Sequence, residues 1–168
     1  MTHPREITHA SVACFAVKDM AKHKGRHAEC RGFLWPRVYV DRAAQFLPGF
    51  DSLMYHEGMH AIEYHNATCG GVLVIGLAAA SMAIGASMPW LALLVPACIA
   101  LWFWLKRSHE ASADAMALWG AGAQDFEAML LMHRAPTGRF ARWCYGATIA
   151  ERRRRAYARL STLRKGDR

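Results

Sequence analysis

The dominant feature of the hydrophobic pattern is one apolar stretch, which runs from Gly70 to Leu105 and contains no charged side chain in 36 residues. A helix rises about 1.5 Å per residue, so that about 20 residues cross the ~30 Å hydrocarbon core of a bilayer. The stretch is therefore long enough for two crossings. Pro89 lies near its middle and suits the first turn of a second helix. The pattern predicts a transmembrane hairpin with spans over residues 70–87 and 89–105.

The residues that flank the stretch support this interpretation. Trp102 and Trp104 stand beside Lys106 and Arg107, which makes an aromatic and cationic edge typical of a membrane interface. Basic residues lie on both sides of the hairpin and none lies in the turn at 86–89, so we expect both chain termini to face the cytoplasm. A buried helical hairpin of a soluble protein is the alternative, although such helices are rarely so long and so free of charge.

Outside the hairpin, one segment has the alternation of a strand. In residues 33–40, Val38 and Val40 alternate with Arg37 and Tyr39. Pro36 lacks an amide hydrogen, which confines this strand to a sheet edge or places the proline at the strand's start. We predict one short edge strand.

The remaining elements are predicted to be helices. Pro48-Gly49 indicates a turn, after which Asp51 or Ser52 is expected to cap a helix over residues 52–66. The sequence therefore predicts a mainly α fold, with further helices over 109–132 and 147–164, and three parts: a basic N-terminal segment (1–34), a core that includes the hairpin (35–134) and a basic tail (135–168).

The net charge of +8 comes from the tail, since residues 134–168 carry +9 and the remainder carries −1. The tail helix has apolar residues along one side and a run of four arginines, 152–155, on the others. Such a helix near a membrane typically rests on anionic lipid, at about 1 kcal/mol per basic residue. Nucleic acid is the less favoured partner, because few aromatic residues interleave the arginines. The apolar side is formed by Ile149, Ala156, Leu160 and Leu163.

Two negative observations bear on the cellular compartment. The five cysteines are odd in number and contain no C-x-x-C pair, which argues against a disulfide framework and fits a reducing compartment. Charged and polar residues interrupt the first 20 positions, so no signal peptide is visible, nor is a eukaryotic targeting signal. We therefore expect an integral protein of a bacterial inner membrane.

Candidate chemistry stands in the helix that precedes the hairpin, where His56-Glu57-Gly58-Met59-His60 matches H-E-x-x-H. Residues four apart share one helix face, so the two imidazoles can converge on one Zn²⁺ ion. Glu57 follows the first histidine and is placed to act as a general base toward a water molecule. The alternative is that both histidines are ordinary polar residues of an amphipathic helix.

A catalytic zinc site needs a third protein ligand. The metzincin pattern fails, because Glu63 and Asn66 stand where it requires glycine and histidine, and we interpret Glu63 and His65 as surface or packing residues. Glu110 follows the hairpin and is the better candidate for the third ligand. Asp114 lies one turn later on the same face and is expected to accept the N–H of a ligand histidine from outside the metal's own ligand set.

These motifs together resemble the HtpX-like and CAAX-prenyl-protease-like integral-membrane zinc metallopeptidases. The family pattern is H-E-x-x-H, then a membrane hairpin, then E-x-x-A-D, which here is HEGMH at 56–60 and EASAD at 110–114. The resemblance covers about residues 35–130 and implies a gluzincin-like helical core. It implies one zinc ion held by His56, His60 and Glu110, with Glu57 as general base and Asp114 outside the ligand set. A strand before the catalytic helix binds extended substrate in this family, and Pro36–Asp41 stands in a similar place.

The chain departs from the family at the residue that stabilises the oxyanion. The family's H-P pair is replaced by Ala147-Thr148-Ile149, although Glu151-Arg152 resembles the residues that come after that pair in the family. His133, Arg139 and Tyr145 are the remaining candidates for this role. The sequence thus predicts a zinc endopeptidase that cleaves protein or peptide substrates at the cytoplasmic membrane face. The alternative is an inactive, membrane-anchored basic module that binds anionic lipid or nucleic acid.

Overall fold

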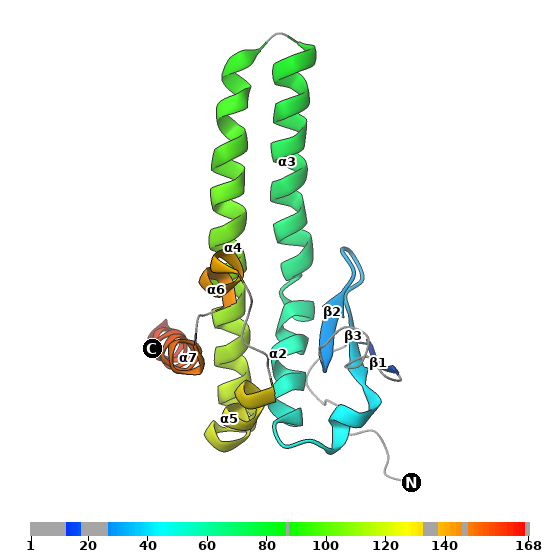
Figure 1. The fold of residues 1–168 in the computed structure, drawn as a ribbon, viewed down its shortest axis with the longest axis vertical. Coiled ribbons are helices and arrows are strands. Elements are labelled where there is room, and N and C mark those ends of the chain that lie inside the picture. Colours follow the sequence, from blue (N-terminus) through cyan, green and yellow to red (C-terminus); the bar gives the residue numbers. More distant parts are fainter. Residues whose placement is uncertain (1–12, 18–26, 87, 133–137, 146–147, 167–168) are drawn as a thin grey trace.

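In the computed structural model, two long helices form a hairpin that rises from a base of shorter elements (Figure 1). The structure describes residues 13–17, 27–86, 88–132, 138–145 and 148–166. The first arm of the hairpin is α3 (His65–Gly85). The chain returns through the short 3-10 helix η2 (Pro89–Leu93) and then through α4 (Leu94–Ala121). Pro89 occupies the first turn of η2, as its missing amide hydrogen favours.

Both arms are long and apolar enough to cross a membrane, as judged by length and composition. Their apolar side chains point outward: within the most apolar window, 17% of the residues are buried in α3 and 6% in the second arm. The helix of a soluble core would instead be mostly buried. The arms touch each other through small residues, since a Cβ atom at Gly76 would lie 3.2 Å from Cys98 Cβ.

Several boundaries differ from the predicted ones. The expected helix over 52–66 is α2 (Phe50–Ile62), and the first arm begins already at His65. The second arm and the segment that carries Glu110 form one continuous helix, α4, which ends where Gly122 adopts a φ of 85°. Helices α5 (Ala123–Met132), α6 (Arg139–Tyr145) and α7 (Ile149–Gly166) then complete the base.

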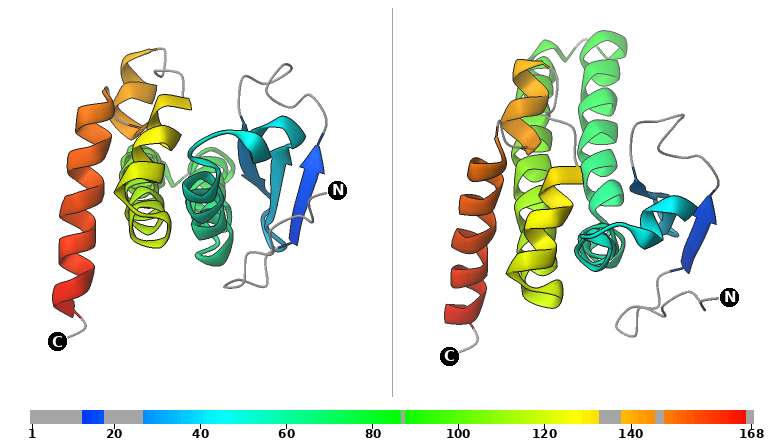
Figure 2. Two further views of the ribbon diagram at one scale, coloured as in Figure 1. Left: turned by 90° about the horizontal axis from the view of Figure 1, so that it is seen from below. Right: turned by 60° about the horizontal axis from the view of Figure 1, so that its bottom comes forward.

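The prediction of one short edge strand is wrong. The structure has a three-stranded sheet in the order β1-β3-β2, with β3 (Arg37–Asp41) at its centre. It pairs in parallel with β1 (Ala13–Val17) and antiparallel with β2 (Ala28–Arg31). Pro36 precedes the strand, so it removes no hydrogen bond from the ladder, and the alternation of buried Val38 and Val40 with Arg37 and Tyr39 is confirmed. The sheet packs on α2 (Figure 2).

The start of α2 is held by a residue from another helix rather than by the expected Asp51 or Ser52 side chain. Asp125 of α5 accepts hydrogen bonds from the backbone amides of Gly49 (2.9 Å) and Ser52 (2.8 Å). Gly49 has a φ of 89°, and a Cβ atom there would overlap the backbone of Met129, so glycine is required. This cap fixes the orientation of α2 relative to α4 and α5.

The tail helix α7 lies against α4 (Figure 2). Ala156 is fully buried and Leu160 packs on the core of the base, as the apolar side of the predicted amphipathic helix requires. Part of its basic surface is used inside the protein. Arg155 donates to the carbonyl oxygens of Trp143 and Cys144, and Arg159 donates to Ser112 Oγ at 3.2 Å.

Candidate metal centre

Helix α2 presents the two histidines of H-E-x-x-H to α4. His56 is buried and His60 lies one turn later, so both rings fall on one face of the helix. Their Nε2 atoms are 3.3 Å apart and the ring planes are inclined at 80°. The two Nε2 atoms therefore converge between α2 and α4.

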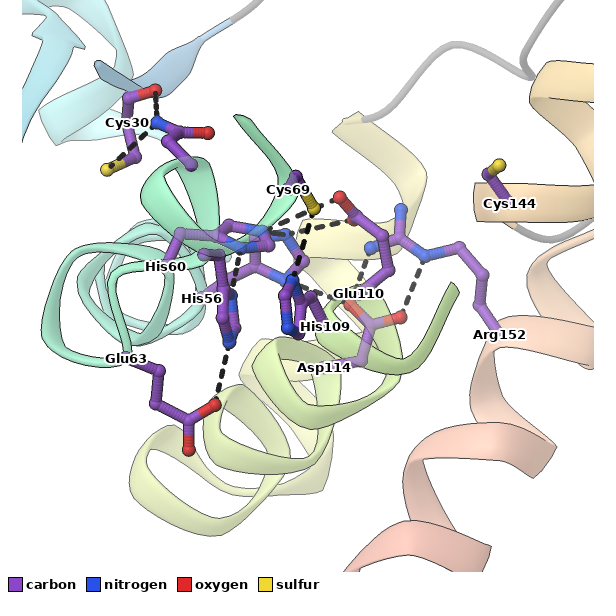
Figure 3. Close-up of polar contacts among 12 residues, drawn as sticks. Cys30, His56, His60, Glu63, Cys69, His109, Glu110, Asp114, Cys144 and Arg152 are labelled. Carbon is purple, nitrogen blue, oxygen red and sulfur yellow. Dashed lines mark hydrogen bonds and ion pairs between the residues drawn. The ribbon is translucent and has the colours of Figure 1, made fainter. Parts of the chain in front are cut away.

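Glu110 of α4 completes a triangle of donor atoms with these two histidines (Figure 3). Its Oε2 is 3.6 Å from His56 Nε2, and its Oε1 is 3.6 Å from His60 Nε2. A tetrahedral zinc ion with Zn–N and Zn–O distances of about 2.0–2.2 Å separates its ligand atoms by about 3.3–3.6 Å. The donor set and its spacing thus fit zinc, with three protein ligands and one vertex left for a reactant.

His56 is oriented by a buried ion pair behind it. Its Nδ1 lies 2.9 Å from Asp114 Oδ1, and because an ionised carboxylate only accepts, the ring must donate. Asp114 in turn receives two hydrogen bonds from Arg152 of α7, at 2.9 Å from Nε and 2.5 Å from Nη2 (Figure 3). This arrangement favours a proton on Nδ1 and turns Nε2 of His56 toward Glu110, where a metal could replace its proton.

The two imidazoles have opposite pKa shifts. Burial acts to lower the pKa of His56, but the hydrogen bonds to Asp114 and Glu110 outweigh it and raise this pKa to about 10. Burial lowers the pKa of His60 to about 3, against the attraction of Glu110. Without a metal, the site therefore holds a positive charge on His56 while His60 stays neutral. A bound cation would supply this positive charge in place of the proton.

Glu57 adds a further carboxylate to this region. It is 8% exposed and follows His56 on α2. Together with Glu110 and Asp114 it gives three largely buried carboxylates in the part of α2 and α4 near Arg152. Buried charge is costly unless it is compensated, and a divalent cation held by His56, His60 and Glu110 would add compensating positive charge.

A second cluster adjoins His60, which the sequence analysis did not foresee. His65 was interpreted as a surface or packing residue rather than a ligand; it is buried, as a packing residue is, with its Nδ1 2.6 Å from His60 Nδ1. Its Nε2 lies 2.7 Å from Glu63 Oε2, and its ring stacks on His109 at 3.8 Å. The spacing of 60 and 65 gives no signal for this contact, because residues five apart point in different directions along a continuous helix.

Three residues were predicted as candidates for the oxyanion role, and they stay predictions. His133 lies outside the described residues, Arg139 is exposed at the start of α6, and Tyr145 is half-buried at its end. Arg152 is the cation that the structure places against the site, and sequence analysis missed it within a run of four arginines. The only signal was its position in the Glu151-Arg152 pair that resembles the family.

No protein-family model, curated protein or solved structure was found to match this chain. The geometry of the described residues therefore carries the functional interpretation.

Proposed function

We propose that the protein is a membrane-embedded, zinc-dependent endopeptidase that hydrolyses peptide bonds at the cytoplasmic face of a bacterial inner membrane. The observation that carries the proposal is the cluster of His56, His60 and Glu110, in which the two Nε2 atoms are 3.3 Å apart and each lies 3.6 Å from a different oxygen of the Glu110 carboxylate. Glu57, which follows His56 on α2, and the Asp114–Arg152 pair support the proposal as candidates for the general base and for the residues that orient His56.

The chemistry divides between the metal and the chain. A bound zinc ion supplies Lewis acidity, which lowers the pKa of water and polarises a carbonyl group. Glu57 accepts the proton of the attacking water and returns it to the leaving amine. Asp114, held by Arg152, keeps His56 in the tautomer that binds a metal through Nε2. We assign to the positive charge of Arg152 the role of opposing the negative charge that develops on the carbonyl oxygen.

The sheet edge nearest to α2 suits an extended peptide, and this edge belongs to β2 rather than to Pro36–Asp41. The backbone groups of an antiparallel strand point alternately toward and away from its partner. His27 O accepts from Asp41 N of β3, so His27 points toward β3, and the backbone groups of Ala28 and Cys30 point away from β3, toward the free edge of the sheet. On that side Cys30 O accepts from Asn66 Nδ2 at 3.2 Å. Burial raises the pKa of the Cys30 thiol to about 12, and the negative charge of Glu57 adds to the rise. Glu57, the proposed general base, is therefore close enough to β2 to act on Cys30.

The position of the hairpin supports action at a membrane surface. α3 begins five residues after His60, and α4 carries the second arm and Glu110 on one continuous helix. If the arms span the bilayer, the triangle lies just below its surface, on the side that the flanking basic residues assign to the cytoplasm. A substrate that emerges from or lies on that surface would reach the site directly.

The test uses the full chain purified in detergent, with metal analysis and cleavage of an unstructured protein substrate. We expect one zinc per chain in the parent and in Glu57→Gln, with cleavage by the parent alone. His56→Ala/His60→Ala should lose the zinc. Cleavage by Glu57→Gln at the parental rate contradicts the proposal, as does zinc retained without both histidines. Zinc in the parent without cleavage of any substrate would favour the inactive basic module that binds lipid or nucleic acid.

A further inference from the structure

The two histidines of the triangle are held by different partners. His56 has the Asp114–Arg152 pair behind it, whereas His60 has His65 and Glu63. We propose that His65, supported by Glu63, is a positioning residue that fixes His60 in its metal-binding tautomer and orientation; this inference rests on the proposed metal site.

The hydrogen-bond geometry leaves one consistent assignment of protons. To offer its Nε2 lone pair to a metal, His60 must carry its proton on Nδ1, which then donates across 2.6 Å to His65 Nδ1. His65 is thereby protonated on Nε2, which donates across 2.7 Å to the Glu63 carboxylate. Each ring nitrogen of His65 is used, so His65 supports a ligand and is not itself one.

The backbone is shaped to make this contact. In a continuous helix, residues 60 and 65 would point about 140° apart. The chain instead leaves α2 after Ile62 and re-enters a helix at His65, through Tyr64 with a φ of 51° and a ψ of 38°. Tyr64 is the one non-glycine residue with positive φ among the described residues, and such a conformation costs about 1–2 kcal/mol. The strained turn swings the ring of His65 back onto His60.

Packing holds His65 in this position from the other arm. Its ring lies parallel to that of His109, with centroids 3.8 Å apart and planes inclined at 6°. His109 Nδ1 is 3.6 Å from Cys69 Sγ, one turn after His65 on α3. His109 directly precedes Glu110 on α4. The stack therefore connects His65, which contacts the proposed ligand His60, to the helix that carries the proposed ligand Glu110. Glu63, by contrast, keeps 45% of its side chain exposed, which places the far end of the chain of hydrogen bonds at the surface.

Two substitutions separate the hydrogen bond from the packing. His65→Phe keeps an aromatic ring to stack on His109 but provides no acceptor for His60. His65→Asn loses the stack but places its Oδ1 near the former Nδ1, where it still accepts. Partners of this kind typically contribute 10–100-fold to metal affinity. We therefore expect His65→Phe to raise the Kd for Zn²⁺ by about 10–100-fold, and His65→Asn to stay close to the parent.

The measurement is zinc competition against a chromophoric chelator, with the full chain in detergent. A second readout is independent of the metal: ¹⁵N NMR of the histidine side chains in the metal-free protein should show His60 protonated on Nδ1 in the parent and in His65→Asn. In His65→Phe this preference should be lost. The spectrum of the parent alone tests the assignment, even where a variant fails to fold.

The inference is overturned if His65→Phe binds zinc as tightly as the parent, if both variants weaken binding equally, or if His60 in the parent is protonated on Nε2. These outcomes differ from failure of the proposed function. A parent that binds stoichiometric zinc and cleaves substrate, with an unaffected His65→Phe, refutes only the positioning role. A parent that binds no zinc, while its His60 is still protonated on Nδ1, refutes the metal site and leaves the hydrogen-bonded pair.

Discussion

The arms of the hairpin and the base of the molecule use the same kinds of side chain in opposite ways. Leu77 in α3 and Trp104 in α4 are 69% and 59% exposed, whereas Phe126 and Met129 in the base are fully buried. The base packs a core of its own around α2, α4 and α5. The arms bury little except the small residues between them, and they are long and apolar enough to cross a membrane.

Helix α4 passes through both regions, and its sequence changes where the environment does. Its early part exposes Leu94, Ile99 and Leu101, and its later part buries the alanines at 113, 115 and 117 around Asp114. The buried charged residue Asp114, with its partners His56 and Arg152, thus lies in the base, immediately below the apolar arms. The cluster of His56, His60 and Glu110 lies at this junction, within protein yet next to the predicted membrane surface.

Removing one member of the buried ion pair should give the largest effect on the base. Asp114→Asn leaves the Arg152 guanidinium without its anion, and loss of one partner of a buried pair costs about 3–5 kcal/mol. We expect a loss of that size in the free energy of unfolding of the base, measured by denaturant titration in detergent. The double variant Asp114→Asn/Arg152→Met should recover part of the loss. Equal stabilities of the parent and Asp114→Asn would show that the pair is not a structural element of the base.

A charge placed in the arm tests the comparison directly. Leu77→Lys and Leu131→Lys alter leucines with nearly equal exposure, 69% and 74%, in the arm and in the base. A lysine in the middle of a span costs about 3 kcal/mol of insertion free energy, whereas an exposed substitution in water stays within about 0.5 kcal/mol. We expect carbonate extraction of membranes to release Leu77→Lys and to leave Leu131→Lys in place. Equal behaviour of the two variants would remove the distinction between arm and base.

The smallest effect concerns two glycines on facing helices of the base. A Cβ atom at Gly58 of α2 would meet nothing within 4 Å, so Gly58→Ala should stabilise the protein by about 1 kcal/mol through helix propensity. A Cβ atom at Gly120 of α4 would lie 2.6 Å from the Tyr55 ring, so Gly120→Ala should destabilise it by about 1–3 kcal/mol. Thermal unfolding followed by circular dichroism should show shifts of opposite sign. Two shifts of the same sign would mean that α2 and α4 approach each other less closely.

Local patterns were sufficient for the elements whose information lies within a few turns of the chain. The length and apolarity of residues 70–105 specified a helical hairpin, and the spacing of four residues placed His56 with His60, and Glu110 with Asp114, on shared faces. These inferences depend only on helix geometry, which is the same in every protein. The sheet was harder to predict, because the parallel pairing of β1 with β3 joins segments about 20 residues apart. Neither strand has a sequence pattern that identifies its pairing partner.

The set of chemical groups and their order along each helix were already contained in the sequence. Which of these groups meet was decided by the packing of the chain. Arg152 comes to Asp114 from a helix 38 residues away, Asp125 caps α2 from α5, and a left-handed Tyr64 turns His65 onto His60. Each contact depends on the packing of separate helices or on one backbone angle at a turn, and neither quantity is encoded in the periodicity of a single segment.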